Sequence, residues 1–193
     1  MIRTIIGAMK RFPRRYLSTD QMAAIPLSGG GVKRAVFITG CDSGFGFSLA
    51  SHMLEESRTK YRDYIVIAGC FYPNGNSAGA DQLLETATRV KSEDFHILSL
   101  DVTCSDSVAK ARDDIDRIVG ASEGAHLWAV VNNAATLVFA DAVFQTEAMF
   151  RRQFEVNVIG AWAISKVSSI FSSNPNSFLK VMFVGTNSFA DGV

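Results

Sequence analysis

Cysteine is scarce in this sequence, and it is not arranged for metal binding or disulfide pairing. Cys41, Cys70 and Cys104 are the only three among 193 residues, and no two of them form a C-x-x-C pair. An odd number of widely spaced cysteines argues against a disulfide-stabilised secreted domain and against a zinc site. Free thiols fit the cytosol or the mitochondrial matrix. The three histidines are scattered as well, so no metal site is predicted.

The chain also lacks an excess of either charge, and it lacks a long apolar run. Lysine and arginine together number 19, as do aspartate and glutamate, so the formal net charge is zero. Without a global field, nucleic acid is not a predicted partner. No apolar run approaches the roughly 20 residues that span a bilayer. With 48% apolar residues, the composition is that of one globular domain with a sizeable core.

The N-terminal segment has no acidic residue before Asp20, although it carries five basic ones. An arginine-rich start without acids is typical of a mitochondrial transit peptide. We therefore expect residues 1–33 to form a basic leader and the flexible linker PLSGGG, and we expect a mitochondrial location. The alternatives are a disordered basic tail or a membrane-surface anchor, with a cytoplasmic location or association with the endoplasmic reticulum membrane.

From Arg34 onward the chain alternates between apolar runs, which predict strands, and segments of helical periodicity. The predicted strands are 34–40, 64–70, 95–102, 127–134 and 179–185, and the predicted helices are 45–57, 80–90, 105–120 and 147–172. Continuous apolar strands that alternate with helices predict a doubly wound parallel sheet over residues 34–193, a Rossmann fold of three α/β/α layers. Ser105 is a plausible cap of the third helix. The turn-rich stretch FYPNGNSAGA, residues 71–80, is expected to be a surface loop.

Three glycines, Gly40, Gly44 and Gly46, follow the first predicted strand in FITGCDSGFG. Glycine allows a positive φ and lets a phosphate approach the backbone. The helix that begins here would point unpaired N–H groups at such an anion. The lysine of a nucleotide-triphosphate loop is absent, which argues against ATP or GTP. A tight structural turn is the alternative interpretation.

The spacing T-G-x-x-x-G-x-G resembles that of the short-chain dehydrogenase/reductase family. TGCDSGFGFSLA is most similar to the branch that contains the D-β-hydroxybutyrate, retinol and 17β-hydroxysteroid dehydrogenases, with the first of these the nearest. LDVT, VVNNAA and FEVNVIG agree with the same family, so the resemblance extends from residue 34 to about 188. It implies the strand order 3-2-1-4-5 and a hydride transfer between a nicotinamide cofactor and a secondary alcohol or ketone.

The resemblance also assigns roles to individual residues. Asn132 is expected to tie neighbouring strands together. Thr186, or Ser188 if the loop is shifted, is expected to bond the substrate oxygen, although both residues also suit a turn. Cofactor binding falls on Thr39, Gly40, Asp42, Ser43, Gly44, Phe45, Gly46, Asp101, Val102, Asn133, Ala134 and Ala135.

Asn157 is the remaining catalytic candidate. Helical periodicity places it on an apolar stripe that is expected to face the sheet, together with Phe150, Phe154, Ala161, Ile164 and Phe171. A buried amide needs a partner, so we expect it to bond a carbonyl or an ordered water. The resemblance implies that this asparagine holds a water in the proton relay. A purely structural asparagine is the alternative.

The sequence contains no Tyr-x-x-x-Lys, the pair that supplies the general acid or base in this family. We therefore expect the fold to be C-terminally truncated and the chain to end before its catalytic pair, as a fragment that is catalytically silent. Within the branch, a retinol or steroid dehydrogenase is the alternative to a hydroxybutyrate enzyme. A catalytically dead cofactor-binding isoform is the alternative from another functional class.

The cofactor and the partners follow from the same resemblance. An acid at the end of the second strand would select NAD, but AGCFYP holds neither an acid nor an arginine at that point. The resemblance favours NAD, with NADP as the alternative. It implies a small alcohol or ketone as substrate and a homo-oligomer for the full-length enzyme, and it leaves membrane association open.

Overall fold

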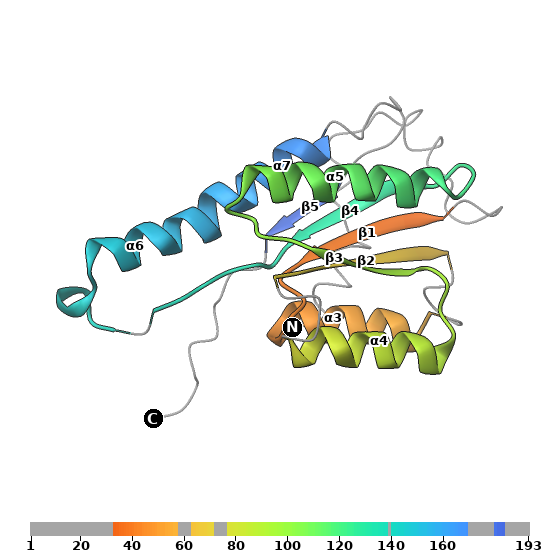
Figure 1. Ribbon diagram of the computed structural model, residues 1–193, viewed down its shortest axis with the longest axis horizontal. Helices are drawn as coiled ribbons and strands as arrows, with labels where there is room; N and C mark the ends of the chain where they lie inside the picture. The colour runs from red at the N-terminus through yellow and green to blue at the C-terminus, as the bar shows by residue number, and fades with distance from the viewer. Residues whose placement is uncertain (1–32, 58–62, 72–76, 139, 170–179, 184–193) are drawn as a thin grey trace, which may run out of the picture.

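The computed structural model describes residues 33–57, 63–71, 77–138, 140–169 and 180–183. Within them a five-stranded sheet lies between two layers of helices (Figure 1). The strands are β1 (Arg34–Thr39), β2 (Tyr64–Cys70), β3 (Phe95–Ser99), β4 (His126–Asn132) and β5 (Lys180–Phe183). The helices are α3 (Gly44–Glu55), α4 (Ala78–Val90), α5 (Ser105–Gly120), η2 (Ala142–Phe144), α6 (Glu147–Phe154), η3 (Glu155–Gly160) and α7 (Ala161–Ser169).

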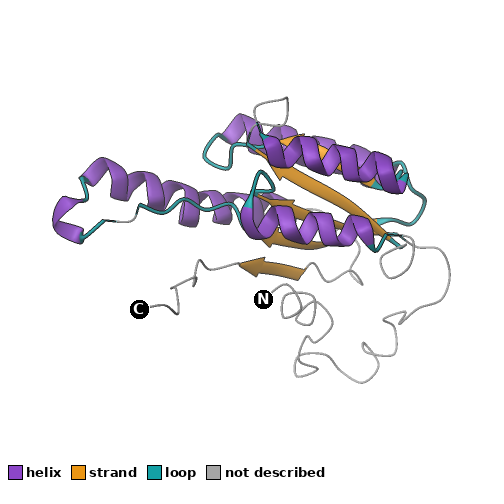
Figure 2. Ribbon diagram, turned by 90° about the horizontal axis from the view of Figure 1, so that it is seen from below, coloured by secondary structure: helices purple, strands orange, loops and turns teal. Residues whose placement is uncertain are grey.

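All strand pairs of the sheet are parallel, in the order β3-β2-β1-β4-β5. The predicted doubly wound fold and its strand order are therefore confirmed. Helices α3 and α4 cover one face, and α5 and α7 cover the other (Figures 1 and 2). Because the chain reverses its winding direction after β3, the carboxyl ends of β1 and β4 flank the switch point where ligands of such folds bind.

The central strand β1 shows why its apolar run is continuous. Val36 and Ile38 point into the core that α3 and α4 cover, whereas Ala35 and Phe37 point into the core that α5 and α7 cover. All four side chains are at most 1% exposed. A strand that is buried on both faces has no polar face, which is why it reads as an unbroken hydrophobic run.

The starts of α5 and α4 differ from the prediction in how they are capped. Cys104, not Ser105, is the N-cap of α5, and it makes no side-chain capping bond. Helix α4 begins at Ala78, inside the stretch that was predicted to be a surface loop, because the Ser77 hydroxyl accepts a hydrogen bond from the Ala80 amide. Residues 72–76 of that predicted loop lie outside the described residues.

The predicted helix 147–172 forms three consecutive helical segments, of which η3 is a π-helix. The prediction that one apolar stripe faces the sheet is wrong for its first half. Phe150 is 62% exposed and Phe154 47%, whereas Ile164 is buried. The physical reason is that α6 projects beyond the sheet, so no strand lies beneath it (Figures 1 and 2). Phe171 lies outside the described residues.

No helix in the described ranges is long enough and apolar enough to cross a membrane. The predicted leader, residues 1–33, lies outside the described residues except for Lys33, so the mitochondrial location stays a prediction. The structure is that of a single chain, so the homo-oligomer also stays a prediction.

Candidate functional site

The turn between β1 and α3 forms one wall of the candidate site. Gly40 and Gly44 adopt left-handed backbone conformations, with φ of 68° and 61°. A Cβ at Gly40 would lie 2.7 Å from the Ala134 Cα atom, whereas a Cβ at Gly44 would meet no atom within 4 Å. Gly40 is therefore needed because the backbone of Ala134 packs against it. Gly44 is favoured by its positive φ, and the space beside it is open.

Gly46 and Gly79 bring neighbouring segments unusually close to this turn. A Cβ at Gly46 would lie 2.3 Å from the Gly40 carbonyl oxygen and 2.5 Å from the Asn133 Nδ2 atom. A Cβ at Gly79, in the first turn of α4, would lie 1.9 Å from the Asp42 carbonyl oxygen. These distances leave no room for a side chain, so both glycines fix the shape of the turn by their lack of one.

A buried polar network ties the glycine turn to the end of β4. The Thr39 hydroxyl accepts hydrogen bonds from the amides of Asn133 and Ala134, each 3.0 Å long, and donates to the Val131 carbonyl. The Asn133 side-chain amide donates to the carbonyls of Thr39 and Gly40 at 3.0 and 2.9 Å. Thr39 is only 1% exposed. Water therefore cannot take the place of its hydroxyl as the hydrogen-bond partner of these backbone groups.

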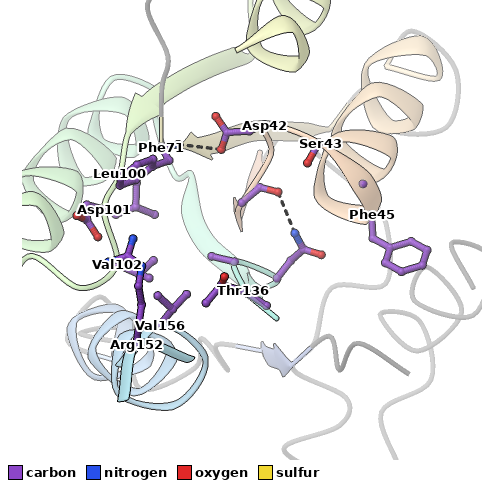
Figure 3. Close-up of a pocket in the computed structure, with 15 residues that line it drawn as sticks. Asp42, Ser43, Phe45, Phe71, Leu100, Asp101, Val102, Thr136, Arg152 and Val156 are labelled. Atoms are coloured by element: carbon purple, nitrogen blue, oxygen red, sulfur yellow. Dashed lines mark hydrogen bonds between the residues drawn. The ribbon is translucent and has the colours of Figure 1, made fainter. Parts of the chain in front are cut away.

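A pocket of about 400 Å³ opens beside this network (Figure 3). Ten of the twelve predicted cofactor-binding residues line it: Gly40, Asp42, Ser43, Gly44, Phe45, Asp101, Val102, Asn133, Ala134 and Ala135. They come from the turn after β1 and from the ends of β3 and β4, so the fold brings together motifs that are about 90 residues apart in the sequence.

The other two predicted cofactor residues, Thr39 and Gly46, do not line the pocket. They lie behind it, where Thr39 bonds the end of β4 and Gly46 packs against the turn. Thr186 and Ser188 lie outside the described residues, so the prediction for the substrate oxygen is untested.

The predictions for two asparagines need correction. Within the described residues the Asn132 side chain bonds a helix and not a strand: its Nδ2 atom donates 3.0 Å to the Ser165 hydroxyl of α7, while its backbone lies in register with Phe183 of β5. Asn157 is exposed rather than buried against the sheet. Its Nδ2 atom donates to the Thr136 carbonyl at 2.9 Å, and its Oδ1 atom accepts from the Thr136 amide at 2.8 Å. The predicted bond to a carbonyl is thus confirmed, and Asn157 holds the segment after β4 in place.

Five further residues line the pocket that the sequence interpretation did not include: Phe71, Leu100, Thr136, Arg152 and Val156. Leu100 lies inside the LDVT motif but was not assigned to cofactor binding, and Thr136 directly follows VVNNAA. Val156 precedes Asn157, and Arg152 lies one helical turn earlier. This spacing was available in the sequence as an i, i+4 pair that faces the same side.

Asp42 connects the glycine turn to the end of β2. Its Oδ2 atom accepts a hydrogen bond of 2.8 Å from the Phe71 amide. A carboxylate therefore stands at the end of β2 although β2 itself supplies none. The sequence interpretation looked for this acid at the end of the strand and missed it because the acid comes from another element.

Cys41, within the turn, and Cys70, at the end of β2, are fully buried, whereas Cys104 is exposed. Burial raises the pKa of the Cys70 thiol to about 12, and the nearby Asp42 carboxylate contributes to this shift. Burial, the neighbouring Cys70 and then Asp42 raise the pKa of Cys41 well above its ordinary value. Both thiols are therefore protonated at neutral pH and unreactive, because the thiolate is the nucleophile.

We expect iodoacetamide at pH 8 to label Cys104 in the native chain and to leave Cys41 and Cys70 unmodified. Peptide mass spectrometry after brief labelling measures this, and labelling in urea is the control in which all three cysteines react. Rapid modification of Cys70 in the native chain would contradict the described burial.

A five-stranded parallel sheet in the order β3-β2-β1-β4-β5, with a glycine turn after its first strand, defines a doubly wound α/β domain of the Rossmann type. The family model described as short chain dehydrogenase matches residues 34–171. The chain belongs to this family.

The curated relatives of this chain are also named as dehydrogenases. The chain is 36% identical to the mitochondrial D-beta-hydroxybutyrate dehydrogenase of Bos taurus over 133 aligned residues. The aligned region covers 69% of this chain and 36% of that protein. The chain is 31% identical over 153 residues to estradiol 17-beta-dehydrogenase 2 of Rattus norvegicus, covering 79% of this chain and 35% of the relative. It is 36% identical over 126 residues to retinol dehydrogenase 7 of Mus musculus, covering 65% and 34%. The matched part thus spans about a third of the length of these relatives.

Solved structures share the fold. A short-chain type dehydrogenase/reductase from Mycobacterium marinum matches with a TM-score of 0.63 at 19% identity, covering 86% of this chain and 59% of that one. The NADPH-bound carbonyl reductase from chicken fatty liver matches with a TM-score of 0.61 at 22% identity, covering 72% of this chain and 52% of that one.

Proposed function

We propose that the chain binds a nicotinamide dinucleotide in the pocket beside the glycine turn, as the cofactor-binding part of an oxidoreductase. The observation that carries this proposal is the open turn at the start of α3. Ser43, the N-cap of α3, makes no side-chain capping bond, so the first N–H groups of a 12-residue helix remain available to a phosphate. Gly44 leaves open space in front of them.

The other walls of the pocket suit the remaining parts of a dinucleotide. Leu100, Val102 and Val156 offer apolar surface for a flat base, beside the Asp101 carboxylate. Asp101 is held in place because its Oδ1 atom accepts bonds from the amide and the hydroxyl of Thr103, at 2.9 and 2.6 Å. The segment from Asn133 to Thr136, which Asn157 holds, forms the wall toward which the nicotinamide would extend. When bound, this cofactor supplies the hydride chemistry.

The position of Asp42 favours NAD over NADP. A carboxylate near the ribose accepts bonds from its hydroxyls, whereas it repels the 2′-phosphate that distinguishes NADP. Asp42 stands beside the end of β2 and lines the pocket. Arg152, the one cation among the described lining residues, comes from the α6 wall instead.

We expect the wild-type chain to bind NADH at least about tenfold more tightly than NADPH, because like charges near the site cost on the order of 1 kcal/mol or more. Asp42→Asn keeps an oxygen for the Phe71 amide and removes the charge. It should improve NADPH binding about tenfold and change NADH binding less than about threefold. Fluorescence titration of both cofactors measures this.

The matched control is Asp81→Asn, since Asp81 is an exposed acid in the first turn of α4 and does not line the pocket. It should leave both affinities unchanged. Equal affinity of the wild type for the two cofactors, or an Asp42→Asn variant that still discriminates against NADPH, would show that Asp42 does not select NAD.

For the whole protein we propose hydride transfer between NAD and a secondary alcohol or its ketone. The support is membership of the family and the relatives named for hydroxybutyrate, estradiol and retinol. We rank a small hydroxy acid first because the glycine segment is most similar to the hydroxybutyrate group, with retinol or steroid substrates second.

The 193-residue chain contains no Tyr-x-x-x-Lys. We therefore expect it to bind NADH without oxidising an alcohol, since general acid–base catalysis contributes about 10²–10⁴-fold to such rates. The assay follows NADH formation with D-3-hydroxybutyrate, retinol and estradiol under conditions in which NADH binding has been measured. Turnover of any of the three would mean that another group in this chain exchanges the proton.

A further inference from the structure

Arg152 is a pocket residue that neither the family motifs nor the glycine turn accounts for. Of the fifteen described residues that line the pocket, it alone carries a positive charge. It lies on α6 one turn before Val156, so that both side chains project from the same face of the helical segment. In Figure 3 the Arg152 side chain extends from the helix toward Val102 and Asp101.

The segment η3, which continues the helix that carries Arg152, packs against the residues that follow β3. A Cβ at Gly160, in η3, would lie 2.7 Å from the Val102 Cγ2 atom. The helical segment and the Leu100–Val102 stretch therefore form two sides of one slot. Arg152 lies on the rim of this slot, opposite the wall to which Asp42 belongs (Figure 3).

Arg152 is also available for a ligand. Its side chain forms no hydrogen bond or ion pair with another described residue, whereas the side chain of its neighbour Arg151 pairs with Glu147 at 2.6 Å within α6. Its guanidinium group therefore keeps its planar set of N–H donors for whatever enters the slot.

We propose that Arg152 positions the adenine base of the dinucleotide, an inference that rests on the proposed function. Adenine is flat, and its ring nitrogens accept hydrogen bonds while its exocyclic amino group donates. A guanidinium donates in one plane and stacks on aromatic faces, and the Asp101 carboxylate on the same slot accepts from an amino group. The apolar side chains of Val102 and Val156 complete a slot that suits a base rather than a phosphate.

The test compares ligands that share different parts of the cofactor. We expect Arg152→Ala to weaken the binding of NADH and of ADP-ribose about tenfold, as for a lost hydrogen bond to a charged group. Nicotinamide mononucleotide, which lacks the adenosine part, should bind the variant and the wild type equally. Arg151→Ala is the matched control, because Arg151 is an exposed arginine on the same helix outside the pocket, and it should bind all three ligands like the wild type.

Each other outcome overturns the inference in a distinguishable way. Equal binding of NADH by Arg152→Ala and wild type would remove Arg152 from the site while leaving the cofactor proposal intact. NADPH is titrated as a fourth ligand, and a loss of affinity confined to NADPH would mean that Arg152 contacts the 2′-phosphate and not the base. If the wild type binds neither NADH nor ADP-ribose, the proposed function itself fails, and the inference fails with it.

Discussion

Gly46→Ala is expected to abolish measurable NADH binding and to destabilise the chain by about 3 kcal/mol, at the upper end of the range for overpacked sites. The added methyl group would lie 2.3 Å from the Gly40 carbonyl oxygen and 2.5 Å from the Asn133 amide nitrogen. Neither atom can retreat easily, because Gly40 belongs to the turn itself and Asn133 holds that turn through two hydrogen bonds. The turn must therefore open, and the amides that we propose to bind the cofactor phosphate would shift with it.

Urea denaturation and NADH titration measure the two effects. Gly120→Ala is the matched control, since a Cβ at the last residue of α5 meets nothing within 4 Å. It should leave binding unchanged and add about 0.4–1 kcal/mol of stability, because alanine reduces the conformational freedom of the unfolded chain. A Gly46→Ala variant that is as stable as the wild type and binds NADH equally would refute the described turn.

Thr39→Val is expected to cost about 3 kcal/mol of stability, because valine keeps the shape of threonine but removes a buried acceptor that serves two partly buried amides. Those amides, of Asn133 and Ala134, each donate to the hydroxyl over 3.0 Å. NADH binding should weaken as well, since the segment after β4 forms one wall of the pocket.

Thr88→Val is the control for the threonine change. Thr88 is exposed on α4, and its hydroxyl donates only to the Leu84 carbonyl of the same helix. This variant should stay within about 0.5 kcal/mol of the wild type, as is usual for surface substitutions. If the two valine variants are equally stable, the Thr39 network does not contribute to the fold as described.

The sheet and its helices were predictable because their signals are local. The run from Tyr64 to Cys70 and the helix from Ser105 to Gly120 match the predicted ranges, since apolar continuity and helical period are properties of short windows. The strand order came from the family resemblance, because no short window carries it. The position of α6 beyond the sheet edge could not be foreseen, since helical period says which side chains share a face and not what that face meets. Phe150 is exposed for this reason.

Most site residues that belong to a sequence motif were predicted correctly. Site residues that depend on contacts between distant segments were missed. The family resemblance of the glycine turn and of the motifs at the ends of β3 and β4 assigned ten of the lining residues correctly. The sequence did not indicate that Gly79 has a structural role. A side chain is excluded there by the Asp42 backbone, which lies 37 positions earlier in the chain. Asp42 was correctly assigned to the turn. Its hydrogen bond with the Phe71 amide was not predicted, because that bond depends on the parallel pairing of β1 with β2. Asn132 was misassigned because its sequence position does not determine whether its amide meets a strand or α7.

Hydrogen–deuterium exchange with and without NADH tests most directly that the glycine turn and the neighbouring strand ends bind the dinucleotide. The account predicts slower amide exchange in peptides that cover residues 40–46, 100–102 and 133–136, with helix α5 between Asp106 and Gly120 unchanged as an internal reference. Protection that is absent at saturating NADH, or that falls on peptides away from these three segments, would contradict it.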